Sequence, residues 1–317
     1  MSRMDNANHA RSFIAWQRDV RRRSPATVYT YSTTLRAYLE VVGETPLDRV
    51  RPSRIETWLE RPRIGRAHGR SGAAATVSKE TTMLRTFYGW LLARGLIDVD
   101  ATALLVAPTV RNVQPKPVPD ESWVALWGAP LDDVERVFLG LGYFCGLRRR
   151  EIVELRAEHV DLAHGQLVGF TRKGGGDDTL PYGLMVETIA RKLPHLLPDA
   201  NAFLRPLREA ADGRPGTWLL AWADGWRTPP RAARLAGLSP GQLDPQHLNR
   251  RLWWIADSAG VERITPHQLR HSMVTNALRA GVPLALVSRL ANHSSVSTTM
   301  RYAKLSGRDL EDWLGTQ

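Results

Sequence analysis

Two histidines and an arginine stand close together near the C-terminal end of the chain, and a tyrosine follows them. His267, Arg270 and His271 are spaced i, i+3 and i+4, so a helix would place them on one face. An arginine offers a planar fork of donors, and together with imidazoles it suits an oxyanion of phosphate type. Tyr302 lies nine residues after His293, and its phenol is a candidate nucleophile. This stretch therefore indicates phosphoryl chemistry.

A second arginine that suits an anion lies far upstream, in the segment Gly-Leu-Arg-Arg-Arg-Glu. On a helix, Arg148 shares a face with Glu151 and with apolar residues of the following turns, whereas Arg149 and Arg150 point elsewhere. A partly buried arginine needs an anionic partner, and Glu151 is placed to supply one. The segment alone leaves two readings open: an arginine fixed for anion recognition, or a structural salt bridge.

A β-hairpin is expected between these two segments. Residues 166–171 have the pattern of a strand, residues 172–178 that of a glycine-rich tip, and residues 179–182 that of the returning strand. Lys173 lies in this tip. It is either an ordinary surface lysine or an ammonium that its flexible stem delivers into a site.

The first third of the chain predicts an all-α unit of about four helices. Apolar residues recur at helical spacing in residues 9–20 and 25–42, after Pro52, and in a long helix that ends near Arg94. Ser24-Pro25 is a typical helix start and Gly43 a typical stop. A basic, glycine-rich loop at residues 61–72 is either a surface connection or a segment that follows phosphates.

Basic residues are concentrated in this first unit. Residues 1–119 hold 19 basic and 10 acidic side chains, whereas residues 120–317 hold 24 and 22, in a chain whose net charge is +11. Such an excess predicts a polyanionic partner, although an arginine-rich genome would give the same composition. The residues predicted to contact DNA are Arg21, Arg22, Arg23, Arg63, Arg66, Arg70, Lys79 and Arg85.

Prolines mark the boundary between two domains. We predict a first domain at residues 1–107, an extended proline-rich linker at 108–119 and a second domain at 120–317. The sequence of the second domain predicts mainly helices, near residues 121, 132–145, 185–196, 202–211 and 248–259. Its residues 213–243 show no clear helix or strand pattern, although the Trp-Leu-Leu segment within them is expected in the core. Apolar residues at 310, 313 and 314 predict a tail helix that docks either in cis or on a neighbouring subunit.

Composition also excludes several kinds of protein. The single Cys145 rules out an internal disulfide, fits a reducing compartment and is typical of a small core residue. No Cys/His spacing suits zinc, so no metal is expected. No apolar run is long enough to cross a bilayer, and the N-terminus has no secretory signal.

Taken in order, these elements resemble the tyrosine recombinase, or phage integrase, family. The match rests on Arg148 in Gly-Leu-Arg-x-x-Glu, on the lysine-glycine hairpin, on His-x-x-Arg-His, and on His293 followed by Tyr302. It covers most of the chain, and the first unit resembles the core-binding domain of that family. The resemblance implies a SAM-like all-α domain and a mixed, mainly α catalytic domain with a small antiparallel sheet, closing on DNA as a C-shaped clamp.

The resemblance also implies a role for each residue. Tyr302 would attack a DNA phosphodiester and form a 3′-phosphotyrosyl link, with His267 as its general base. Arg148 and Arg270 would bind the non-bridging oxygens, Lys173 would protonate the leaving 5′ oxygen, and His293 would hydrogen-bond the phosphate. Glu151 and His271 would support the site. Because the phosphotyrosyl bond conserves the energy of the broken ester, neither ATP nor a metal cofactor would be needed.

Three departures from the family pattern qualify this reading. Ala291-Asn292 stands where the family usually has Leu-Gly, which alters a turn but no catalytic group. The hairpin carries Asp177-Asp178 where basic residues are common, so Arg172 is an alternative to Lys173. The N-terminus begins almost directly with the core-binding unit, which leads us to expect a compact Xer-like recombinase without arm-type sites.

The expected partners follow from the same resemblance. They are a duplex DNA recombination site, a homotetramer or a heterotetramer with a paralogue, and an accessory DNA-bending or directionality protein, in the cytoplasm of a prokaryote or of a phage host. Two alternatives share the constellation: a type IB topoisomerase and a DNA-binding relative without catalysis. A metal-dependent nuclease would need a cluster of carboxylates, and none stands out.

Overall fold

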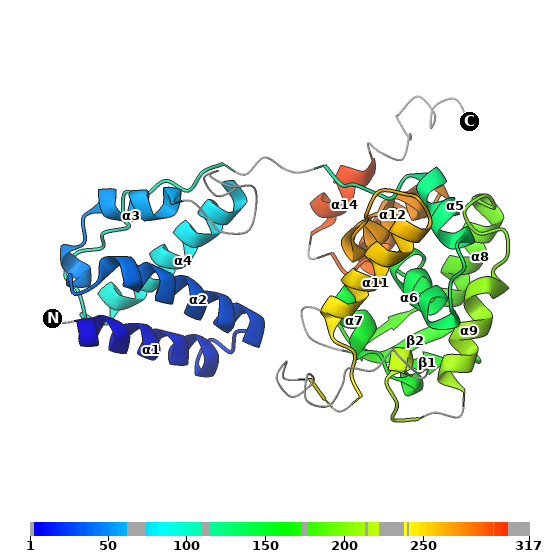
Figure 1. Ribbon diagram of the computed structural model, residues 1–317, viewed down its shortest axis with the longest axis horizontal. Helices are drawn as coiled ribbons and strands as arrows, with labels where there is room; N and C mark the ends of the chain where they lie inside the picture. Colours follow the sequence, from blue (N-terminus) through cyan, green and yellow to red (C-terminus); the bar gives the residue numbers. More distant parts are fainter. Residues whose placement is uncertain are drawn as a thin grey trace. The chain divides into compact units, whose positions relative to one another are not determined.

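The structure is a computed structural model that describes residues 3–61, 74–109, 114–172, 177–212, 215–221, 238–239, 241–293 and 295–303 (Figure 1). The chain divides into two compact units, residues 1–113 and 114–317. Both are mainly helical, and the second also contains a small antiparallel sheet. The predicted class of two mainly α domains with one small sheet is therefore confirmed.

The described part of the first unit is all-α and is built around aromatic side chains. Its helices are α1 (Arg3–Asp19), α2 (Pro25–Val42), α3 (Pro52–Glu60) and α4 (Ala74–Ala93). Ser24 caps α2 by accepting a hydrogen bond from the amide of Thr27 at 3.3 Å, and Gly43 ends the helix at φ 64°. Phe13 of α1 lies edge-on to Phe87 of α4 at 5.1 Å between ring centroids, so ring packing holds α1 to α4.

The described part of the second unit places one helix at the centre of a larger core. Its elements are α5 (Asp120–Gly128), α6 (Asp133–Tyr143), α7 (Arg149–Glu154), β1 (Val160–Asp161), β2 (Gln166–Thr171), β3 (Asp177–Leu180), α8 (Tyr182–Lys192), α9 (Asn201–Ala211), α11 (Pro245–Ser258), α12 (Pro266–Arg279), α13 (Leu284–Leu290) and α14 (Val296–Ala303). Helix α12 is buried at every position from 272 to 278. It contacts α6, α11, α13 and α14, so residues on its first turns are held from several sides (Figure 1).

A sharp turn between α6 and α7 brings the chain close to α12. Gly146 has φ 66°, a conformation that side-chain-bearing residues rarely adopt. A Cβ at this position would also lie 2.3 Å from the Cε atom of Met273 on α12, so the end of that methionine would have to shift. Glycine is therefore required at the position that leads into Arg148.

The three strands pair in the order β1-β2-β3, all antiparallel. The register shifts between Leu167 and Phe170, where Gly169 has φ 62°. The returning strand begins at Asp177 rather than at residue 179, and Tyr182 begins α8 instead of ending the strand. Lys173 lies outside the described residues.

The proline-rich stretch 108–119 spans the division between the units, and residues 114–119 belong to the second. Val118 is buried there. Within residues 213–243, Leu219 and Leu220 are buried, as expected of the Trp-Leu-Leu motif. Residues 213–214, 222–237 and 240 of this segment are not described. The expected tail helix also lies outside the described residues. None of the helices described is both long enough and apolar enough to cross a membrane.

Candidate active site

Three consecutive main-chain carbonyls at the end of α13 each accept a hydrogen bond from a different arginine. The bonds run from Arg172 to Leu290 (2.9 Å), from Arg270 to Ala291, and from Arg148 to Asn292 (3.3 Å). Carbonyls at a helix C-terminus have no partner within the helix and carry partial negative charge. The end of α13 therefore holds three guanidinium groups that come from three other segments of the second unit.

The turn that presents these carbonyls also positions His293. The amide of Asn292 donates to the carbonyl of Arg289 at 2.9 Å, and the amide of His293 donates to that of Ser288 at 3.0 Å. This pair of bonds is a Schellman motif, which needs a left-handed residue at Asn292, and its φ is 45°. Asparagine tolerates that conformation better than other residues with a side chain, so it can stand where glycine is usual.

Arg148 is fixed by Glu151, although not in the way the sequence suggested. Arg148 precedes α7 in an extended conformation and acts as its N-cap, so the predicted shared helix face is wrong. Its amide and its guanidinium donate to the two carboxylate oxygens of Glu151, at 2.8 and 2.7 Å. Burial tends to raise the pKa of Glu151, but the hydrogen bonds from Arg148 and the nearby charge of Arg172 outweigh it and lower the pKa. Glu151 is therefore an anion that fixes Arg148.

Arg270 is buried within the second unit, with only 2% of its surface exposed. One of its terminal nitrogens donates to the carbonyl of Gly146 at 2.6 Å and the other to Ala291. Burial, followed by the charge of Arg148, lowers the pKa of Arg270 to about 9, which still leaves it charged at neutral pH. This fixed cation lies one turn along α12 from His267.

Arg172 is a third buried guanidinium, which sequence reasoning named only as an alternative to Lys173. It is 3% exposed, donates to Asp178 at 2.9 Å and lies 4.0 Å from Glu151. Its Nε and one terminal nitrogen have no hydrogen-bond partner among the described residues. Among the described side chains, these three guanidinium groups face two carboxylates, Glu151 and Asp178. The surplus positive charge favours binding of an anion.

The three histidines and the tyrosine meet beside these arginines. The ring centroids of His267 and His271 are 4.5 Å apart, and those of His271 and Tyr302 are 5.5 Å apart. His293 lies 6.2 Å from Tyr302 with the two rings 22° from parallel. Nδ1 of His293 shares a hydrogen bond of 2.8 Å with the hydroxyl of Thr299 on α14. The structure thus brings a nucleophile candidate and a base candidate to the same place.

The ionisation of these groups suits proton transfer at neutral pH. Burial raises the pKa of the Tyr302 phenol, and the charges of Arg270 and Arg301 offset this only in part. Desolvation and the charges of Arg270 and Arg148 lower the pKa of His267, although its side chain is still solvent-exposed. The pKa of His271 and that of His293 are each lowered to about 4, mainly by burial. All three imidazoles are therefore neutral at pH 7, and the phenol is protonated.

The predicted site residues fall into two groups. Among the described residues, Arg148, Glu151, His267, Arg270, His271, His293 and Tyr302 come together. Lys173 lies outside the described residues. Sequence reasoning missed the three carbonyls at the end of α13 because every residue has a carbonyl and side-chain types give no signal for it.

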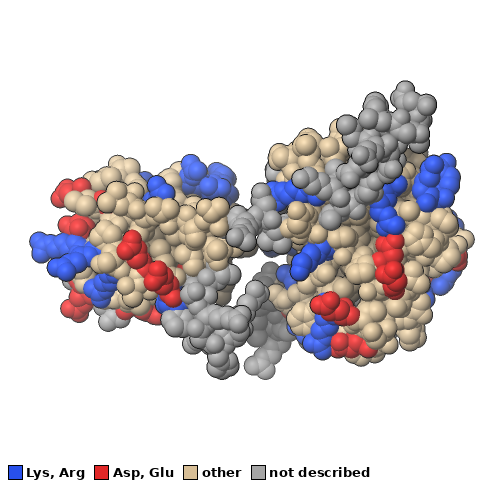
Figure 2. Space-filling model, turned by 90° about the horizontal axis from the view of Figure 1, so that it is seen from above, with Lys and Arg blue, Asp and Glu red and all other residues tan. Residues whose placement is uncertain are grey.

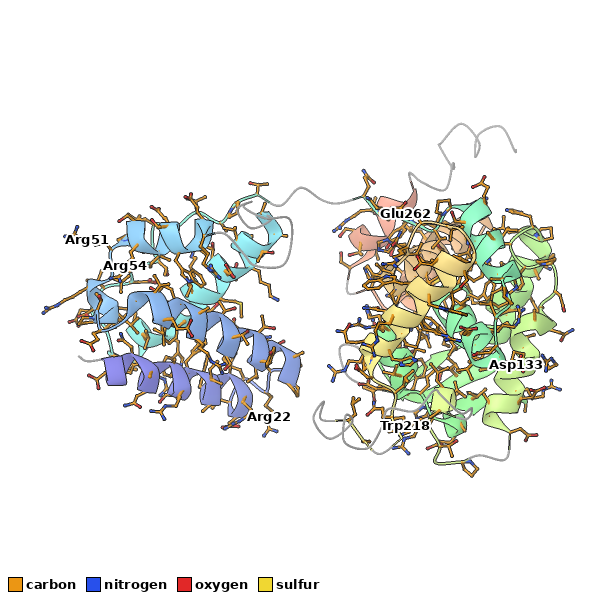
Figure 3. The ribbon with its side chains drawn as sticks, viewed as in Figure 1. Arg22, Arg51, Arg54, Asp133, Trp218 and Glu262 are labelled. Atoms are coloured by element: carbon orange, nitrogen blue, oxygen red, sulfur yellow. The ribbon has the colours of Figure 1, made fainter. Side chains whose placement is uncertain are left out.

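Those of the predicted DNA-binding residues that the structure describes are exposed on the first unit. Arg23 and Lys79 line one groove between α2 and α4, whose volume is about 670 Å³ and whose other lining residues include several hydroxyls. Arg85 is exposed on α4, and Arg21 stacks on Trp16. Figure 3 shows Arg22 at the opposite end of the unit from Arg51 and Arg54. The predicted residues Arg63, Arg66 and Arg70 lie outside the described residues.

The surface charge of the first unit is mixed on the face seen in Figure 2. Basic and acidic side chains are interspersed at the left end of the unit in this view, and further acidic side chains lie in its middle. The described residues therefore form no single continuous basic stripe on that face.

Comparison with known proteins assigns both units. Residues 125–308 match the model of the phage integrase family, and residues 12–95 match the phage integrase N-terminal SAM-like domain. Tyrosine recombinase XerC of Corynebacterium efficiens is 27% identical over 296 residues, covering 91% of this chain and 84% of the relative. XerC of Mycobacterium tuberculosis is 28% identical, covering 90% and 89%.

Solved structures share the fold. A lambda integrase dimer bound to a COC′ core site superposes with a TM-score of 0.69 at 16% identity, covering 96% of this chain and 78% of the other. XerH bound to palindromic difH, in a post-cleavage complex, has a TM-score of 0.61 at 15% identity, covering 92% and 80%. Because the match to the phage integrase model spans residues 125–308, more than half of the chain, the chain belongs to that family, the site-specific recombinases of the tyrosine type.

Proposed function

We propose that this protein cleaves and rejoins duplex DNA at a specific site through a 3′-phosphotyrosyl intermediate on Tyr302. The observation that carries the proposal is the meeting of Tyr302, three neutral imidazoles and three fixed guanidinium groups in one place. A phosphodiester carries one negative charge and gains more charge on its oxygens in the transition state. The surplus positive charge beside Tyr302 suits that requirement.

His267 acts as the general base for Tyr302. The phenol has a raised pKa and holds its proton at neutral pH, so it needs a base in order to attack. His267 has a lowered pKa and is neutral, so it can accept this proton. In the reverse step the same imidazole returns the proton when the phenol leaves.

Arg148 and Arg270 bind the two non-bridging oxygens of the phosphate. Each guanidinium has five N–H hydrogens, and the protein acceptors already described do not use all of them. Because those acceptors fix the position of each group before the substrate arrives, little reorganisation remains for the chemical step. His293 is neutral; if Thr299 donates to its Nδ1, the ring carries its proton on Nε2 and can donate it to the phosphate.

The chemical step forms the bond from the Tyr302 oxygen to phosphorus and breaks the bond from phosphorus to the 5′ oxygen. The leaving 5′ oxygen takes up a proton, and we propose that the ammonium of Lys173 donates it. Because one phosphate ester replaces another, the bond energy is kept, and the reaction requires neither a nucleotide nor a metal cofactor.

Duplex DNA is the proposed partner, with strand exchange in a tetramer of this chain alone or with a paralogue. The lambda integrase and XerH structures that share the fold are bound to DNA, and a lambda integrase tetramer is bound to a Holliday junction. The groove of Arg23 and Lys79, together with Arg85, supplies cations for the phosphate backbone. We further propose a cytoplasmic, nucleoid-associated location and an accessory DNA-bending or directionality protein.

The test is to trap the covalent intermediate. The protein is incubated with host or phage junction DNA, the mixture is separated on a denaturing gel, and the DNA of the adduct is sequenced. Tyr302→Phe should bind DNA but form no adduct, whereas Tyr29→Phe, which changes an exposed tyrosine of α2, should form it normally. An adduct that survives Tyr302→Phe would overturn the assignment.

A further inference from the structure

The end of the proline-rich stretch is attached to α12 by main-chain hydrogen bonds. Its sequence from Pro115 to Pro119 alternates proline with another residue. Proline has no N–H, so Lys116 and Val118 supply the only main-chain donors of this five-residue strap. Both donors are used: Lys116 donates to Nδ1 of His271 at 3.0 Å, and Val118 donates to the hydroxyl of Ser272 at 2.9 Å.

The two acceptors are neighbours on α12, and the strap lies close against that helix. Pro115 and Val118 are buried, whereas the side chain of Lys116 is exposed. The hydroxyl of Ser272 in turn donates to the carbonyl of Gln268 at 3.1 Å, so it both donates and accepts a hydrogen bond. The strap is therefore a fixed part of the second unit from Pro115 onward rather than a free tether.

The bond from Lys116 determines which nitrogen of His271 carries the proton. A neutral imidazole has one N–H, and because Nδ1 accepts, the proton is on Nε2. The bond also fixes the rotation of the ring. This ring lies 4.5 Å from that of His267 and, edge-on, 5.5 Å from that of Tyr302. His271 is thus the contact between the strap and the two groups assigned to the proton transfer.

We propose that the strap Pro115–Pro119 positions the nucleophile and its base through His271. The hydrogen bond from the amide of Lys116 fixes the His271 ring in contact with the rings of His267 and Tyr302. Through this contact, the segment that joins the two units increases the rate of cleavage. His271 is a positioning residue in this scheme and contacts no phosphate. The inference rests on the proposed phosphotyrosyl chemistry.

The test separates the amide of Lys116 from its side chain. Lys116→Pro removes the N–H, whereas Lys116→Ala keeps it; both remove the side-chain charge. The ratio of the cleavage rates of the two variants therefore reports the effect of the hydrogen bond. The measurement is the single-turnover rate of adduct formation on the junction DNA that yields the covalent adduct. DNA affinity and melting temperature are measured for the same variants. We expect Lys116→Pro to cleave about three- to tenfold more slowly than Lys116→Ala at saturating DNA, with equal affinity.

A double-mutant cycle shows whether His271 carries the effect. In a His271→Leu background the ratio between the two Lys116 variants should fall to about one, because the acceptor is absent. A ratio of one with His271 present would overturn the proposal, and so would an equal slowing in both backgrounds. Wild-type protein that forms no adduct would instead refute the phosphotyrosyl chemistry itself.

A second comparison covers the case in which Lys116→Pro unfolds. His271→Asn keeps an acceptor oxygen near the place of Nδ1, whereas His271→Leu has none. We expect the Asn variant to cleave faster than the Leu variant at equal DNA affinity. Equal rates for the two would count against the role of the hydrogen bond.

Discussion

Two exposed arginines of the first unit and two buried arginines of the second are placed in opposite ways. In the first unit Arg23 and Arg85 are exposed and no carbonyl or carboxylate fixes them among the described residues. In the second unit Arg172 and Arg270 are almost wholly buried and are held by main-chain carbonyls. An exposed cation attracts DNA phosphates through an electrostatic interaction that added salt screens. A fixed, buried cation can instead stabilise the negative charge that develops on the phosphate in the transition state. The first set should therefore govern affinity and the second set rate.

The largest expected effect is the loss of rate on changing Arg270. Arg270→Lys keeps the charge but loses the planar fork that reaches both Gly146 and Ala291. We expect the rate of adduct formation to fall by roughly 10² to 10³ at saturating DNA, with DNA affinity nearly unchanged. Single-turnover assays beside gel-shift titrations measure the two quantities. A variant that loses affinity instead of rate would break the comparison between the two units.

Arg172 should have the next largest effect. Arg172→Met keeps an unbranched apolar stem but removes the donors to Leu290 and Asp178, which join the base of the hairpin to the end of α13. We expect cleavage to slow by about ten- to a hundredfold, since a buried guanidinium and its hydrogen bonds are lost beside the site. The matched control is Arg150→Met, whose exposed pair with Glu154 contributes little. If both variants cleaved alike, Arg172 would have no part in the site.

The sequence predicted local features of this site better than distant ones. Helical spacing placed His267, Arg270 and His271 on one helix, and the Arg148–Glu151 pair followed from a separation of three residues. The sequence did not reveal that Arg148 precedes its helix, because a cap and a helix face both favour a residue three positions away. It also could not show the burial of Arg172, which depends on the fold that brings β2 to α13. Tertiary contacts of this kind leave no periodic pattern.

The exposed cations of the first unit should change affinity and its dependence on salt. Arg23 and Lys79 line the same groove, so replacing both with alanine removes two candidate phosphate contacts. The slope of log affinity against log salt should become shallower by about two, and affinity should fall by about tenfold at low salt, with the rate at saturating DNA unchanged. Arg51→Ala, at the other end of the unit in Figure 3, is the control. An unchanged slope in the double variant would remove this groove from the DNA-binding surface.

The smallest expected effect concerns Asn292, and it tests how the buried arginines are held. The left-handed backbone at φ 45° has a steric free-energy cost for alanine, which has a Cβ atom, but not for glycine. We expect the free energy of unfolding of Asn292→Ala to be about 1 kcal/mol lower than that of Asn292→Gly. Denaturant titrations of the two variants measure this difference. Because the turn presents the carbonyls that hold Arg148 and Arg270, the alanine variant should also cleave more slowly than the glycine variant at equal DNA affinity. Equal cleavage despite the stability difference would mean that the arginines keep their places without this turn.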